Sequence, residues 1–349
     1  VDPLGLIDRY GADALRFTLA AMESQGRDIK LDEKRVEGYR NFATKLWNAA
    51  RFLQMSGVGA SQSISAPEAE LPVNRWIIGE VVETLAKLNS AFDELRYDEM
   101  ADAIYHFTWG TFCDWYVELV KGQFDDETRR VAAWAFDQIL VMLHPLMPFV
   151  TEELWHAMGT RPYELIVAKW PEPESEVDAK AKAEMEWLIT LVEEVRSMRV
   201  DAQVPPGAVL PTSVLIDENN ERPLLNKHTD AILRLARLRP AELEYDRIAG
   251  LEEQQGQVGS VTLVDEYRLI EKPPAYWTIS FQMPVGGLTL VSQVDGFIDG
   301  AAVRASLTKA AAAAEKERDQ LAARLANPAF VERAKPEAVD KARADHADK

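Results

Sequence analysis

Apolar side chains recur every three or four residues through much of the first half of the chain, which is the period of an amphipathic α-helix. This pattern predicts four helical stretches, namely residues 7–56, 74–95, 98–124 and 131–158. The small, polar residues from Ser56 to Pro72 predict a loop. Pro145 and Pro148 predict a break in the fourth stretch, because proline has no N–H to donate to the helix ladder. We expect these helices to form one bundle that ends near Trp170.

The pattern changes after the segment WPEPESE. One more helix is predicted over residues 178–199, before Pro205 and Pro206, and another over 224–238. Short apolar runs separated by turn residues predict strands over residues 209–216, 243–245, 260–264, 276–281 and 288–294. Together these elements indicate a small α+β unit.

The last part of the chain is rich in alanine and in charged residues. It carries a heptad-like repeat at Leu307, Ala311, Ala314, Arg318, Leu321 and Leu325. The ANPAF segment predicts a turn, and a second helix is predicted to begin near Pro336. The expected fold class is therefore mainly α, with a helical bundle, a small α+β domain and a C-terminal coiled-coil helical hairpin.

Charge and composition narrow the choice of partners. The 349 residues carry a net charge of −18, which on average repels the phosphates of nucleic acids. Binding depends on local patches, however, and basic residues cluster in two stretches, Arg35, Arg40, Lys45 and Arg51, and Arg234, Arg237 and Arg239. No apolar run approaches the roughly 20 residues that cross a bilayer, and one cysteine cannot form an internal disulfide. These features predict a soluble, cytoplasmic protein, and the start at Val1 suggests a piece of a longer chain.

Several residues that could carry chemistry have simpler explanations. Cys113 lies near His106 and Asp114, but a thiol inside an aromatic helix is more simply a buried structural residue. His144 and His156 lack a metal-ligand spacing such as HExxH, so we interpret them as core or surface histidines. Glu152 and Glu153 lie close to these histidines in the sequence. Asp28, Asp32 and Glu33 could work as an acid/base pair, but at the start of a predicted helix they are more simply capping and dipole-compensating residues. We expect no active site and no metal site in these residues.

One stretch, from Lys34 to Phe52, does suggest a binding role. A predicted helix there places at least three of five side chains near one face, the five being Arg40, Lys45, Asn48, Arg51 and Phe52. Basic groups for phosphate, an amide for base edges and a ring for stacking are what unpaired RNA bases require. The alternative is a packed helix with a solvated face, in which Trp47 and Phe52 are buried.

Long segments of the chain resemble class I aminoacyl-tRNA synthetases, and among these the bacterial valyl-tRNA synthetases. VDPLGLIDRYGADALRF is similar to the segment directly after the KMSKS loop of that class, and QGRDIKLDEKRVEGYRNFATKLWNAARF resembles the valine-specific enzymes rather than their isoleucyl and leucyl relatives. FCDWYVELVK and LHPLMPFVTEELW resemble the helical anticodon-binding domain of that group. RLANPAFVERAKPEAVDKARAD resembles the turn of the C-terminal coiled-coil arm. The resemblance covers nearly the whole chain.

The resemblance implies a division into domains. Residues 1–35 would be a stem-contact segment following the catalytic domain, and residues 36–170 would be the helical anticodon-binding domain. Residues 171–298 would be a small α+β linker domain, and 299–349 a coiled-coil tRNA-binding arm.

The resemblance also implies site residues. Phe52 would stack on a splayed anticodon base, and Val117 would pack beside it. Phosphate and base-edge contacts would come from Lys34, Lys45, Asn48 and Arg51. The arm would reach the outer corner of the tRNA through one or more of Arg324, Arg333, Lys335 and Arg343.

In whole enzymes of this family, valine is activated with ATP and Mg²⁺ and is then esterified to tRNA(Val). The HIGH and KMSKS motifs and the editing domain lie before the position that corresponds to Val1. We therefore expect the chain to bind tRNA(Val) as a monomer, to hold no cofactor, and to be inactive alone. Valine and ATP would bind only the catalytic half. Two alternatives stay open, namely the same region of an isoleucyl or leucyl enzyme, and a helical interaction scaffold with no role in RNA binding.

Overall fold

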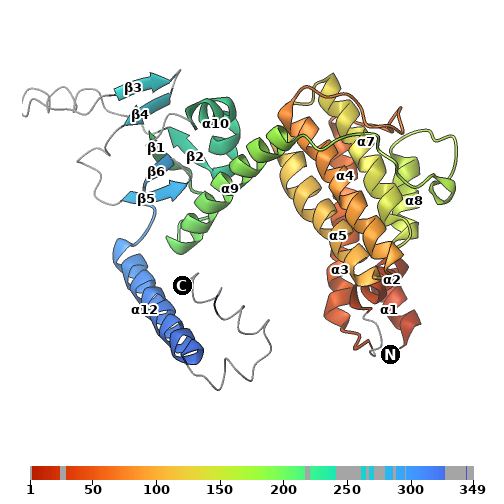
Figure 1. Cartoon of the computed structure of the whole chain (residues 1–349), viewed down its shortest axis with the longest axis horizontal. Coiled ribbons are helices and arrows are strands. Elements are labelled where there is room, and N and C mark those ends of the chain that lie inside the picture. The colour runs from red at the N-terminus through yellow and green to blue at the C-terminus, as the bar shows by residue number, and fades with distance from the viewer. Residues whose placement is uncertain are drawn as a thin grey trace, which may run out of the picture. The chain divides into compact units, whose positions relative to one another are not determined.

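The chain forms two compact units, Val1–Ile189 and Thr190–Lys349. The computed structural model describes residues 2–23, 29–216, 221–240, 261–264, 267–270, 280–285, 288–294, 296–326 and 343. In the described residues the first unit is helical and the second holds a β-sheet with helices (Figure 1). The predicted fold class, mainly α with a small α+β region, is confirmed.

Separate helices occupy the N-terminal region. α1 (Pro3–Tyr10) and α2 (Ala12–Met22) meet at Gly11, whose φ of 89° lies in the region that favours glycine. α3 (Glu33–Met55) begins after Asp32, whose side chain accepts a hydrogen bond from a backbone N–H of the first turn. The stretch predicted as helical over residues 7–56 thus consists of separate helices, with breaks at Gly11 and before α3. The apolar period continues through Gly11, while its backbone leaves the α-helical region.

The aromatic stretch after α4 is not a regular α-helix. α4 (Pro72–Asp93) leads to α5 (Tyr97–His106), then to a π-helix, η1 (Phe107–Tyr116), and to one turn of α-helix, α6 (Val117–Val120). A π-helix joins residues five apart rather than four apart by hydrogen bonds. The helix predicted over residues 98–124 is confirmed as far as Val120, but its period differs over η1.

Two further helices complete the bundle, α7 (Asp126–Leu143) and α8 (Pro148–Ala157). The break between them lies at Pro145 and Pro148, as predicted. No side chain next to α8 in sequence caps its start. Instead, Asp13 of α2 accepts hydrogen bonds from the N–H groups of Phe149 (3.1 Å) and Val150 (2.6 Å). A carboxylate of α2 thus accepts hydrogen bonds from two N–H groups in the first turn of α8, which have no partner within that helix, and so joins the two helices.

The core of this unit is aromatic. Its largest fully buried side chains are Trp134, Tyr116, Phe17, Phe42, Phe112 and Phe136. A buried polar group crosses it. The Asn74 amide donates to Glu127 (2.9 Å) and Thr128 (3.1 Å) and accepts from the Tyr116 hydroxyl (3.0 Å). Because a buried polar group without a partner is costly, this network specifies how α4, η1 and α7 pack.

A buried ion pair joins α7 to the segment after α8. Arg161 donates two hydrogen bonds to the Asp137 carboxylate (2.6 and 2.7 Å), and the two side chains are only 3% and 7% exposed. The guanidinium also lies 3.6 Å from the ring centre of Trp155 and donates to its carbonyl oxygen. Burial raises the pKa of Asp137, while the arginine acts against this shift. The Asp137 carboxylate is therefore kept charged in its buried position by Arg161.

The second unit is built on a six-stranded sheet among the described residues. Helix α9 (Ala179–Asp201) runs through the boundary between the units, and α10 (Arg222–Ala236) comes after the first strand. The strands are β1 (Leu210–Ile216), β2 (Leu238–Pro240), β3 (Val261–Val264), β4 (Tyr267–Ile270), β5 (Ser280–Val285) and β6 (Leu288–Gln293).

The strand order is β3-β4-β1-β6-β5, and β2 also pairs with β1. β1 is central, because it pairs in parallel with β2 and β4 and antiparallel with β6. The strands predicted over 209–216, 260–264 and 288–294 correspond to β1, β3 and β6, whereas the one over 276–281 overlaps only the start of β5. β2 and β4 were not predicted, and the strand predicted over 243–245 lies outside the described residues.

The C-terminal region begins with one long helix, α12 (Gly300–Leu325), which Asp299 caps by accepting two backbone N–H groups. Arg318, one of the positions of the heptad-like repeat, is exposed and forms an ion pair with Asp319 (2.9 Å). The predicted second helix of the hairpin lies outside the described residues. Within the described part of the chain, no helix has both the length and the apolar character needed to span a membrane.

The buried ion pair yields a stability prediction. We expect Arg161→Ala to lower the free energy of unfolding by about 3–5 kcal/mol, because it leaves the Asp137 charge buried without its partner. Urea denaturation followed by circular dichroism measures this change. Asp102→Asn, in an exposed pair with His106, is the control and should change stability by less than about 0.5 kcal/mol. Equal effects of the two variants would contradict a structural role for the buried pair.

Candidate nucleic-acid interface

Helix α3 carries five of the six residues proposed from sequence to contact the anticodon, all except Val117. Its apolar face is buried, with Val36, Phe42, Leu46 and Leu53 all fully inaccessible. Lys45, Asn48 and Phe52 occur at steps of three and four residues, so they lie along one neighbouring face of the helix. Asn48 is exposed, whereas Lys45 and Phe52 are partly buried at the edge of that face. We call these three residues the α3 stripe.

One end of the α3 stripe contacts the π-helix. The Lys45 ammonium group forms an ion pair with Asp114 and lies 4.4 Å from the ring centre of Trp109. Trp109 and Asp114 are five residues apart, which in an α-helix would place them about 140° apart around the axis. The π-helical turn brings both side chains to the same lysine. An α-helical period, as expected from the sequence, predicts neither Trp109 nor Asp114 beside Lys45.

The other end of the stripe contacts residues that directly follow α6. The rings of Phe52 and Phe124 have centroids 6.0 Å apart at an angle of 58°. The Lys121 ammonium group lies 5.7 Å from the centre of the Phe52 ring and pairs with Glu118 (3.3 Å). Two aromatic rings and a cation therefore meet at this end. Phe52 and Val117 were predicted here, but not Lys121, the last residue of the FCDWYVELVK segment, or Phe124, three residues further on.

The other proposed anticodon residues differ in accessibility. Lys34 and Arg51 are exposed on α3. Lys34 lies eleven residues before Lys45, which corresponds to about 16 Å along the helix axis. Val117 is only 6% exposed, so its side chain belongs mainly to the bundle core and offers little surface to a base.

The residues proposed for the arm are only partly described. Arg324 is exposed in the last turn of α12, and Arg343 is exposed as well. Arg333 and Lys335 lie outside the described residues. Arg324 and Arg343 both have interacting partners, and their roles in RNA binding stay predictions.

The cysteine and the carboxylates that the sequence analysis interpreted as structural residues have the following surroundings. Cys113 is buried, and burial raises the pKa of its thiol to about 12, so it has no nucleophilic thiolate near neutral pH. Asp32 caps α3 as expected, and Glu33 forms an ion pair with Arg9. Asp28 lies outside the described residues.

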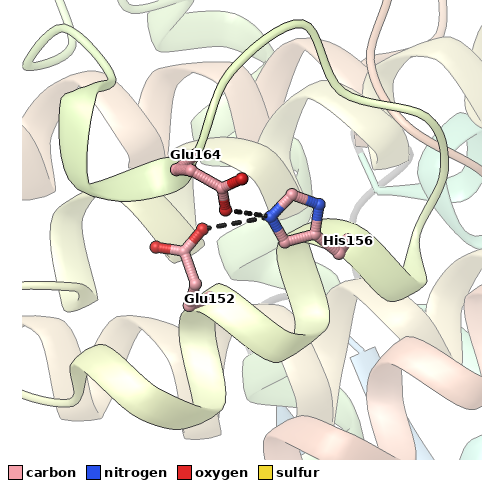
Figure 2. Close-up of side chains that lie close together, drawn as sticks. All are labelled: Glu152, His156 and Glu164. Carbon is pink, nitrogen blue, oxygen red and sulfur yellow. Dashed lines mark hydrogen bonds and ion pairs between the residues drawn. The ribbon is translucent and has the colours of Figure 1, made fainter.

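The histidines behave differently from each other. Neither was predicted to be a metal ligand, but the fold brings His156 together with Glu152 and with Glu164, a residue that the sequence pattern did not indicate (Figure 2). The hydrogen bond with Glu164 raises the pKa of His156 above its usual value, and Glu152 acts in the same direction. Burial instead lowers the pKa of His144. Glu153 is not a member of this group.

Comparison with known proteins places these features in a family context. Residues 74–215 match the family described as the anticodon-binding domain of tRNA ligase. The chain is 55% identical over 358 residues to a valine–tRNA ligase of Rhizorhabdus wittichii, a match covering 100% of the chain and 37% of that protein. Valine–tRNA ligases of Sphingopyxis alaskensis (48% identity, 100% of the chain, 38% of the relative) and Zymomonas mobilis (45%, 97% and 36%) also match.

The chain thus spans little more than a third of the length of the curated relatives that it matches. All three are valine-specific by name, in agreement with the resemblance found in the sequence motifs. Over its whole length the chain is therefore similar to the C-terminal part of valine–tRNA ligases, and within it residues 74–215 match the anticodon-binding domain of tRNA ligase.

Proposed function

We propose that the chain is the tRNA-binding part of a valine–tRNA ligase and that its helical bundle binds the anticodon of tRNA(Val). The observation that carries this proposal is the 55% identity over the entire chain to a valine–tRNA ligase, together with the anticodon-binding match over residues 74–215. Attachment of valine with ATP and Mg²⁺ would be performed by the remainder of the full-length enzyme. The 349 residues would supply recognition and no adenylate chemistry.

The α3 stripe is our candidate for the contact with unpaired anticodon bases. Phe52 has a partly exposed ring that lies close to Phe124 and Lys121. A base stacked on such a ring gains dispersion energy irrespective of its identity. Asn48, one turn away and exposed, has an amide that can donate to and accept from a base edge. Recognition of a particular anticodon would then depend on the amide, and affinity on the ring.

Cations around the stripe would contact the phosphates. Lys34 and Arg51 are exposed, while Lys45 is shared between Asp114 and the Trp109 ring in the free chain. A phosphate that approaches Lys45 competes with the Asp114 carboxylate for the same ammonium group. The net charge of −18 makes such local arrangements decisive, because the surface as a whole repels RNA.

The remaining parts of the proposal concern the arm and the setting. The C-terminal region, with Arg324, Arg333, Lys335 and Arg343, would contact the outer corner of the tRNA. The full-length enzyme would act as a monomer in the cytoplasm, where the buried Cys113 would remain a free thiol.

Binding to different tRNAs tests the proposal as a whole. We expect the chain to bind tRNA(Val) more tightly than a tRNA with another anticodon in a gel-shift titration at moderate salt. Low salt should raise both affinities, because phosphate contacts release counterions. A tRNA(Val) transcript with only its anticodon exchanged is the control. If it binds as well as the natural sequence across the salt range, the proposed anticodon recognition is wrong.

Replacement of Phe52 tests the stacking contact. Phe52→Ala should weaken tRNA(Val) binding by about 1–3 kcal/mol, the range for loss of one base–aromatic stack. Fluorescence anisotropy with labelled tRNA(Val) measures the change. Phe92→Ala removes another exposed ring, at the end of α4, and should leave affinity unaltered. An unchanged affinity in a folded Phe52→Ala protein would remove Phe52 from the site.

Replacement of Asp114 should strengthen tRNA binding rather than weaken it. Asp114→Asn should strengthen tRNA(Val) binding by about 0.2–1 kcal/mol, because it releases Lys45 from an exposed ion pair and removes a negative charge near the phosphates. Glu194→Gln on α9 changes the net charge equally and serves as the control. The gain should shrink as salt rises. Weaker binding by Asp114→Asn would show that Lys45 needs its carboxylate partner to be positioned.

A further inference from the structure

Three potential metal ligands converge outside the α3 stripe. Glu152 and His156 are one turn apart on α8, and Glu164 lies just before the short 3₁₀ helix η2 (Leu165–Val167). One ligand atom from each side chain lies within 4.8 Å of those of the other two. His156 Nε2 is 3.3 Å from Glu152 Oε1 and 2.5 Å from Glu164 Oε2, and Figure 2 shows both carboxylates directed at this ring nitrogen.

The backbone holds these ligands together. The Glu152 carboxylate accepts the N–H groups of Leu165 (2.7 Å) and Ile166 (3.2 Å), the two residues directly after Glu164. The Trp155 indole donates to the carbonyl oxygen of Tyr163, the residue before Glu164 (3.0 Å). The segment that carries the third ligand is therefore attached to α8 on both sides. A ligand set held in this way loses little conformational entropy when a cation binds.

The charges of the group favour a cation. Two carboxylates direct an oxygen at one imidazole nitrogen, and a cation placed between these atoms would be attracted to both carboxylates. A second ring faces Glu152 from the end of α7. The Nε2 atom of His144 is buried, has no hydrogen-bond partner among the described residues, and lies 3.9 Å from Glu152 Oε2. Its Nδ1 atom is already engaged with Thr151 (2.8 Å). The Nε2 atom of His144, which has no hydrogen bond among the described residues, thus faces the Glu152 carboxylate.

We propose that Glu152, His156 and Glu164 form a binding site for a divalent transition-metal cation, with Zn²⁺ as the ion that fits best. Tetrahedral zinc with bonds of about 2.0–2.1 Å separates its ligand atoms by about 3.3 Å, and the Glu152–His156 pair already has this spacing. Glu164 is exposed and can move outward from its present 2.5 Å contact. The fourth position is open to water. Imidazole nitrogen combined with carboxylates favours zinc over magnesium, which prefers oxygen ligands.

The proposed metal site shares no residue with the α3 stripe, and a bound ion would join α8 to the segment around residues 163–166. Isothermal titration of the whole 349-residue chain with ZnCl₂ in a non-chelating buffer at neutral pH tests it. We expect one equivalent to bind, and MgCl₂ at the same concentration to give no saturable heat.

Matched variants separate this site from general binding to an acidic surface. His156→Ala should weaken Zn²⁺ binding by at least about tenfold, because loss of even an outer partner of a metal ligand costs roughly 10–100-fold. Glu164→Gln should also weaken it, and this exposed residue is replaceable without loss of the fold. His106→Ala is the control, since His106 also faces a carboxylate one turn away, Asp102 (3.2 Å), but belongs to no such group in the described residues.

Two results would overturn the proposal. One is the absence of saturable Zn²⁺ binding by the folded chain. The other is binding that survives in both His156→Ala and Glu164→Gln, or that falls equally in His106→Ala. Circular dichroism of each variant would establish that it is folded, and tRNA(Val) affinity measured without metal would test the proposed function separately.

Discussion

The burial of one face of α3 is the constraint on which the candidate interface depends. Val36, Phe42, Leu46 and Leu53 are fully inaccessible, and their burial stabilises the bundle by roughly 1.5–3 kcal/mol for each large side chain. Rotation of the helix to hide its polar residues would expose this face. The packing energy therefore fixes the direction of the Lys45, Asn48 and Phe52 side chains, although it has no connection with RNA.

The π-helix next to α3 determines which side chains surround the exposed face of α3. It places Trp109 and Asp114 against Lys45, and the chain after it brings Lys121 and Phe124 to Phe52. Lys45 is consequently held by a carboxylate and a ring, whereas Arg51 is exposed. Residues of the same charge on one helix thus differ in how readily they can reach a phosphate. π-Helical turns often occur at functional sites, and here the turn joins the two ends of the stripe to one neighbouring segment.

In both units, irregular segments are attached to neighbouring helices by polar groups rather than by apolar contacts alone. Arg161 and Asp137 anchor the chain after α8, and Glu152 holds the backbone at Leu165 and Ile166. In the second unit the buried Arg199 donates to the carbonyl oxygens of Ala208 and Pro205 and so holds the turn before β1. Such bonds satisfy backbone groups that have no ladder partner. In the first of these regions they also bring the Glu152, His156 and Glu164 ligands together.

The sequence by itself determined the helical character of the bundle, its proline break, the start of α12 at an alanine-rich repeat and the family to which the chain is related. These depend on local periodicity and on long motifs, which the order of residues contains directly. Only the tertiary structure decided the break at Gly11, the π-helical period that joins Trp109 and Asp114, and the inaccessibility of Val117. It also decided that Glu164 lies beside His156. These features depend on contacts between residues distant in sequence or on a backbone angle that an apolar pattern does not record, so periodicity could not predict them.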